Sequence, residues 1–206
     1  MRHSTIRFAW FALALAGTVL SGPASAQILQ NLEDKVVGKP GPEQIAAARD
    51  EVREAAQAAL SALYALQPAA RRAVEGAAGY AAFSTVGMKL LIAGGTSGKG
   101  IAVDRRTGAR TYMRMTQVQG GLGFGVSKNQ VIFVFTAQKA LADFIAQGWE
   151  FGAQANLSAV AKGEGGMFTG AAALAPNVYV YQITETGLNA ELTVAGTRFY
   201  VDQDLN

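Results

Sequence analysis

The chain has 206 residues, of which 50% are hydrophobic and 16% are charged, and it contains no cysteine. This composition argues against an intrinsically disordered chain, which has too little apolar surface to bury, and it excludes disulfide bonds. Without Arg2 and Arg7, the 18 Lys and Arg fall to 16 against 15 Asp and Glu, a net charge of +1 that is too balanced for a general nucleic-acid-binding protein.

Residues 1–26 are predicted to be a cleaved signal peptide. An apolar run from Phe8 to Leu20 follows two arginines, and Ala24-Ser25-Ala26 has the small-x-small pattern that signal peptidase accepts. As a helix the run would be about 20 Å long, shorter than the roughly 30 Å hydrocarbon core of a bilayer. We therefore expect Sec-type export, a mature chain that starts near Gln27, and a periplasmic or extracellular location; an uncleaved membrane anchor is the alternative.

The only histidine is His3, so the mature chain is expected to contain neither histidine nor cysteine. Their absence excludes Ser-His-Asp and Cys-His catalysis and the usual zinc sites. We expect a non-enzymatic protein without a cofactor or metal, although an enzyme that uses carboxylates or lysine is a weaker alternative. Asp202 and Asp204 are expected to lie in a solvated C-terminal tail.

Two helices are predicted to open a single domain that spans residues 42–206, after an irregular segment at 27–41. Apolar residues fall at helical spacing from Ile45 to Leu66, and Pro42 suits the first turn. Pro68 ends this helix and starts a shorter one that runs to about Glu75.

After Gly79 the pattern changes to short strands, with one further helix at Ala137–Gln147. The stretch Asp104–Gly108 between two strands is predicted to be a hairpin turn. The strands are expected at Tyr80–Val86, Lys89–Ala93, Gly100–Asp104, Arg110–Met115, Gln130–Thr136, Trp149–Ala155, around Met167–Leu174, Asn177–Thr184 and Leu188–Val194. The predicted fold is α+β, with N-terminal helices packed on a large, mainly antiparallel, glycine-rich sheet that is barrel-like if it curls.

Two glycine-rich segments have some features of nucleotide-binding loops. In Gly94–Gly100 a phosphate loop would need glycine in place of Ala93 and Ser or Thr in place of Gly100. In Gly120–Gly125 the last glycine of the dinucleotide fingerprint would fall on Val126. We predict turns and closely packed strands at both segments, and no nucleotide partner.

The order of several weak motifs resembles the SYLF family. They are Gly79-Tyr80-Ala81-Ala82-Phe83, Gly94-Gly95 with Gly98-x-Gly100, Gly121-x-Gly123-x-Gly125, Gly148-Trp149-Glu150-Phe151-Gly152, Tyr179-Val180-Tyr181, Gly187-Leu188 and Gly196-Thr197. The likeness covers roughly Leu60 to Asn206. It implies phospholipid binding without catalysis, with phosphoinositides as ligands in eukaryotic members, and the signal peptide resembles the bacterial exported branch.

The basic residues gather in one part of the sequence, where eight of them accompany only two acidic residues, Glu75 and Asp104. We predict that they bind anionic headgroups at the cell envelope: Arg71, Arg72, Lys89, Lys99, Arg105, Arg106, Arg110 and Arg114. The alternatives are a set of solvated turn charges, and an envelope protein whose sheet docks another protein chain. Trp149 and Phe151 are expected to be structural rather than lipid-facing.

Overall fold

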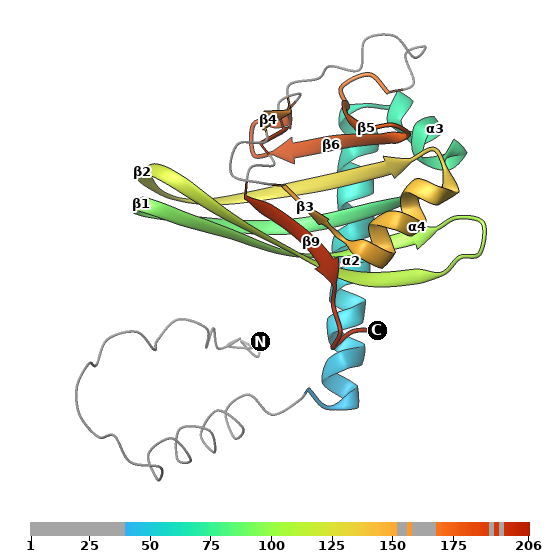
Figure 1. Cartoon of the computed structure of the whole chain (residues 1–206), viewed down its shortest axis with the longest axis horizontal. Helices are drawn as coiled ribbons and strands as arrows, with labels where there is room; N and C mark the ends of the chain where they lie inside the picture. Colours follow the sequence, from blue (N-terminus) through green and yellow to red (C-terminus); the bar gives the residue numbers. More distant parts are fainter. Residues whose placement is uncertain (1–39, 152–155, 158–167, 190–191, 194–195) are drawn as a thin grey trace, which may run out of the picture. The chain divides into compact units, whose positions relative to one another are not determined.

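The computed structural model describes residues 40–206 except 152–155, 158–167, 190–191 and 194–195. The predicted signal peptide and nearly all of the predicted irregular segment lie outside this part of the chain. Its helices are α2 (Pro42–Leu66), α3 (Ala69–Gly76) and α4 (Gln138–Gln147), as Figure 1 shows. All three agree with the predicted helices to within a few residues. None of these described helices has the length and hydropathy needed to cross a membrane.

Helix α2 begins where the sequence chemistry favours a helix start. Pro42 occupies the first turn, and the Gly41 N–H donates to the side-chain oxygen of Gln44 at 3.0 Å. One face of the helix is buried against the sheet, through Val52, Ala56, Ala59, Leu60 and Leu63. Because alanine and leucine favour helix and fill this face, burial and intrinsic propensity act together.

Two long strands replace the four short ones predicted between residues 80 and 115. Strand β1 (Gly79–Asp104) pairs along its whole length with the antiparallel strand β2 (Arg110–Phe135), and the predicted turn joins them. The register shifts once, between Leu91 and Ala93. The glycine-rich segments at 94–100 and 120–125 are therefore strand, which confirms the closely packed strands predicted there and corrects the predicted turns.

The β1–β2 ribbon doubles back on itself, and glycines make this possible. A Cβ atom at Gly100 would lie 2.5 Å from the Ala82 carbonyl oxygen, and one at Gly98 would lie 2.7 Å from that of Ser84. Since real Cβ atoms do not approach oxygen so closely, residues 94–103 need glycine where they pack against residues 79–88. Both ends of each strand thus lie near the helices, and the middle of the ribbon projects away from them (Figure 1).

Within the described residues the main sheet has seven strands, and each pairing is antiparallel. Its path is β3 (Trp149–Glu150), β9 (Thr197–Val201), β2, β6 (Val178–Thr184) and β5 (Ala172–Ala175), with β1 beside β2 and β7 (Gly187–Asn189) beside β6. Strands β4 (Asn156–Leu157) and β8 (Leu192–Thr193) form a separate pair. The sheet curls into a half-barrel with helices α2 and α3 on one face and α4 on the other, which confirms the predicted α+β fold.

The two faces of the sheet hold two hydrophobic cores. Neighbouring residues of β2 alternate between them: Ile132 and Val134 face α2 and α3, whereas Phe133 and Phe135 face α4. The second core is rich in aromatic edge contacts, such as those of Phe133 with Phe83 and Phe199 at centroid distances of 6.0 and 5.0 Å. The continuous apolar run at 131–135 is therefore explained by burial on both faces.

Candidate functional site

Three of the eight predicted basic residues meet around two tyrosines, where the hairpin turn lies against the end of α3. The Arg71 guanidinium carbon lies 4.5 Å from the centroid of the Tyr64 ring. The backbone N–H of Arg105 donates to the Ala78 carbonyl at 3.0 Å, which fixes the turn beside the residues that follow α3. We call Tyr64, Tyr80, Arg71, Arg105 and Arg110 the arginine–tyrosine surface.

Burial and the neighbouring positive charges act in opposite directions on the pKa values of the two tyrosines. Burial raises the pKa of Tyr64 above its usual value, and the positive charges of Arg71 and Arg105 oppose that rise. Burial likewise raises the pKa of Tyr80, against the charges of Arg110 and Arg105. The three arginines are exposed and the two tyrosine rings are half-buried. The surface therefore presents guanidinium groups to solvent beside rigid aromatic rings.

Two acidic residues, Asp104 and Glu75, lie near this surface. The Asp104 carboxylate accepts the backbone N–H groups of Arg106 and Thr107 at 2.8 and 3.1 Å, and Gln138 donates to its other oxygen at 2.6 Å. Desolvation alone would raise the pKa of Asp104, but these hydrogen bonds hold it below its usual value. Glu75 lies 3.8 Å from Arg71 in an exposed pair, a geometry that binds weakly in water.

The other five predicted residues lie in four places. Arg72 is exposed on α3, and Arg106 is exposed in the hairpin turn. Lys89 is partly exposed in the projecting middle of the ribbon. Lys99 and Arg114 line a cleft of about 330 Å³ between the first turns of α2 and the C-terminal residues. The structure thus divides the eight residues among separate regions instead of forming one continuous site.

Arg114 is engaged by the C-terminal segment. Its guanidinium donates to Asp202 at 2.7 Å and to Asp204 at 2.9 Å. The hydrogen bond to Asp202 raises the pKa of Arg114. The Asp202 side chain is only 1% exposed, so the predicted solvated tail is wrong for Asp202, whereas Asp204 is exposed. Leu205 is buried as well. Arg114 holds the end of the chain in place, a role that charge and periodicity alone do not reveal.

Trp149 and Phe151 lie beside the aromatic core, as predicted. Trp149 makes edge contacts with Phe133, Phe135 and Phe144 at centroid distances of 6.1, 6.3 and 5.3 Å. Phe151 meets Trp149 at 5.9 Å, also edge-on. These contacts assign both side chains to packing.

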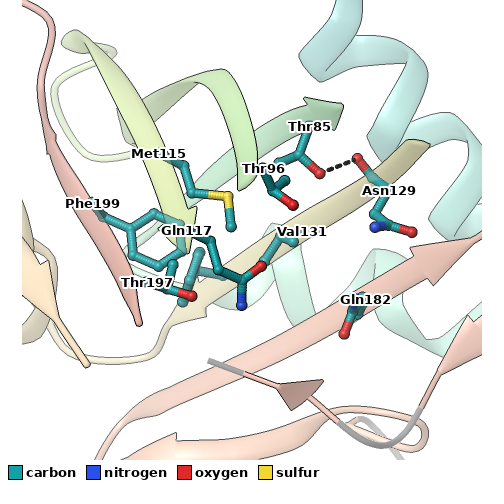
Figure 2. Close-up of a pocket in the computed structure, with 10 residues that line it drawn as sticks. Thr85, Thr96, Met115, Gln117, Asn129, Val131, Gln182, Thr197 and Phe199 are labelled. Carbon is teal, nitrogen blue, oxygen red and sulfur yellow. Dashed lines mark hydrogen bonds between the residues drawn. The ribbon is translucent and has the colours of Figure 1, made fainter. Parts of the chain in front are cut away.

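A small polar pocket inside the half-barrel was not predicted (Figure 2). Its wall includes Thr85, Thr96, Gln117, Gln182 and Thr197, together with apolar side chains such as Phe199. Its volume of about 20 Å³ suffices for a single water molecule. Among the described residues, the buried Oε1 of Gln182 and Oγ1 of Thr197 have no hydrogen-bond partner. Alternation within Met115-Thr116-Gln117 and Thr197-Arg198-Phe199 is the sequence signal that places polar residues on the inner face.

Comparison with known proteins finds two similarities. The family model described as Las17-binding protein actin regulator (Ysc84), which represents the SYLF domain, matches residues 116–206. The chain is also 32% identical over 158 residues to beta cell expansion factor A of Aeromonas veronii, an alignment that covers 77% of this chain and 59% of that protein. The chain therefore matches less than two thirds of this relative's length. All eight predicted basic residues precede the region matched by the family model.

Proposed function

The chain carries a SYLF-family domain, and from this premise we propose that it is a non-enzymatic protein that binds anionic phospholipid surfaces. The matched family is described as a Las17-binding actin regulator, and SYLF-family membership suggests lipid or protein binding, so binding is the common element. For this chain we propose phospholipid as the ligand, and the cell envelope reached by export as the place of action. A docking site for a protein partner is the alternative, which the family's description as Las17-binding favours.

The arginine–tyrosine surface is the observation that supports lipid binding best. Arg71, Arg105 and Arg110 gather there and outnumber the two nearby carboxylates, those of Asp104 and Glu75. A guanidinium group binds phosphate oxygens through two parallel N–H donors, which an ammonium group does not offer in fixed geometry. Each basic residue near an anionic membrane contributes on the order of 1 kcal/mol to binding. Three arginines together are therefore enough for a measurable, salt-sensitive attraction.

The test is co-sedimentation of the protein with vesicles of phosphatidylglycerol and phosphatidylcholine at low salt. We expect Arg105→Glu with Arg110→Glu to weaken this binding at least about tenfold, because two attractive charges become repulsive. Both side chains are exposed, so the melting temperature should change little. Binding to pure phosphatidylcholine should be weak for wild type and variant alike.

The matched control is Arg53→Glu with Arg198→Glu, which changes the net charge equally at two other exposed positions. The control should retain most of the binding. Equal losses in both double variants would mean that net charge alone drives the attraction. Full binding by the Arg105/Arg110 variant would remove this surface from the function and leave the protein-docking alternative.

A further inference from the structure

The projecting end of the β1–β2 ribbon forms a second contact surface, which we propose inserts among the headgroups of an anionic phospholipid bilayer. We call this end, residues 86–95 and 118–128, the ribbon tip. The proposal rests on the proposed function, because the ligand is of the same class, an anionic phospholipid surface. The tip lies at the opposite end of the ribbon from the hairpin turn and extends away from the helices (Figure 1).

Exposed apolar side chains concentrate at the ribbon tip. Of the five large hydrophobic residues that are exposed in the described part of the chain, four lie here: Val86 at 50%, Met88 at 46%, Val118 at 77% and Val126 at 61%. A single exposed valine is ordinary on a protein surface, whereas a cluster on a protruding element marks an interaction site. The fifth, Leu66, lies at the end of α2.

The strand register places these side chains on the outside of the doubled ribbon. Met88 is the cross-strand partner of Val126, and Val86 is the partner of Lys128, so these four share one face. Gly87 between them is buried and faces Thr96 across the fold-back. Val118 lies in the other layer of the doubled ribbon, and its neighbour Gln117 points inward to the polar pocket. Both outer faces of the tip therefore carry apolar groups.

The charges at the tip favour an anionic membrane over other occupants. Lys89 and Lys128 are its only charged residues, and Asp104 at the far end of the ribbon is the only acidic residue between Glu75 and Asp143. Lysine chains beside an inserted apolar group reach back to the headgroup phosphates. A second copy of the tip would instead bring the lysines of two molecules together, and like charges oppose such contact.

Backbone hydrogen bonding limits the depth of insertion. Pairing between β1 and β2 satisfies the facing edges of the ribbon along its whole length. An unpaired strand edge is not tolerated in the hydrocarbon core, where no water replaces the missing partner. We therefore expect the tip to lie at the boundary between headgroups and acyl chains instead of crossing the bilayer.

A single fluorescent label tests the proposal cleanly because the chain has no cysteine. Val126→Cys carries an environment-sensitive dye at the tip, and Glu54→Cys carries the same dye on the exposed face of α2 as the matched control. With phosphatidylglycerol vesicles, we expect a blue shift and a several-fold brighter emission from the dye at position 126 only. A dye at position 126 that keeps its aqueous spectrum while the protein sediments with vesicles would overturn the insertion and leave the proposed function standing.

Two other outcomes would also count against the proposal. If the labelled protein does not sediment with vesicles at all, the proposed function fails together with the insertion. If the dye at position 126 responds to protein concentration without vesicles, the occupant of the tip is a second copy of the chain.

An unlabelled variant separates the tip from the arginine–tyrosine surface. At about 0.5 M salt, screening removes most of the attraction of exposed arginines, whereas apolar insertion persists. Val86→Thr, Met88→Gln, Val118→Thr and Val126→Thr together keep the charge unchanged and should reduce the salt-resistant binding at least about tenfold, given the loss of four apolar contacts. Leu66→Gln, the control at the exposed apolar residue outside the tip, should leave that binding unchanged. Unchanged salt-resistant binding in the tip variant would overturn the proposal.

Discussion

At the scale of single residues, the arginines of this chain divide by what their guanidinium groups touch. Arg114 contacts the nearly inaccessible carboxylate of Asp202, so its charge is part of the fold. Arg105 and Arg110 are exposed beside Tyr80 and are free to meet a ligand. In the sequence all three lie in one basic stretch. No local pattern distinguishes Arg114 from the other two, because its partner, Asp202, lies near the C-terminal end of the sequence.

We predict that Arg114→Met destabilises the protein by about 2 kcal/mol, since it leaves the carboxylate of Asp202 buried without its cation. The partial exposure of Arg114, at 41%, places the effect below that of a fully buried pair. Arg110→Met, the control, should change the free energy of unfolding by less than about 0.5 kcal/mol. Chemical denaturation of both variants measures the difference, and equal stabilities would show that the C-terminal segment is held by other contacts.

At the scale of elements, the helices were predictable and the lengths of the strands were not. Residues 42–66 repeat apolar groups at helical spacing, and proline or glycine marks both ends of the segment. Strand prediction relies on alternating side chains, and glycine-rich stretches such as 94–100 supply few of them. Glycine in this stretch allows residues 94–103 to pack against residues 79–88, where the ribbon doubles back on itself. No local sequence pattern encodes this contact.

The close packing where the ribbon doubles back on itself leads to a prediction about two of its glycines. Gly100→Ala should cost about 2–3 kcal/mol, because the new methyl group would overlap Phe83 and the Ala82 carbonyl oxygen. Gly125→Ala should be nearly neutral, since no atom lies within 4 Å of the added Cβ. Thermal unfolding of the two variants provides the comparison. Comparable melting temperatures would mean that residues 79–88 and 94–103 are not in close contact.

At the scale of the whole molecule, cleavage of the predicted signal peptide determines which residues the mature protein contains. We predict cleavage after Ala26, because the small residues at 24 and 26 fit signal peptidase. The intact mass of the exported protein should equal that of the chain from Gln27, allowing for cyclisation of this glutamine. Ala24→Leu should impair processing and serves as the control. Recovery of the wild-type chain at full length from a membrane fraction would contradict the prediction and support an uncleaved anchor.

The β1–β2 ribbon is long enough to hold the two proposed lipid contacts far apart. The arginine–tyrosine surface lies at one end and the ribbon tip at the other, a separation of about 40 Å for a dozen residues of extended strand. Two lipid contacts so far apart and facing opposite ways do not fit one flat bilayer. A molecule that uses both ends must bridge two membranes, and its addition to a vesicle suspension should increase turbidity. Such clustering requires both ends of the same molecule, so loss of either one abolishes it even where adsorption to single vesicles survives.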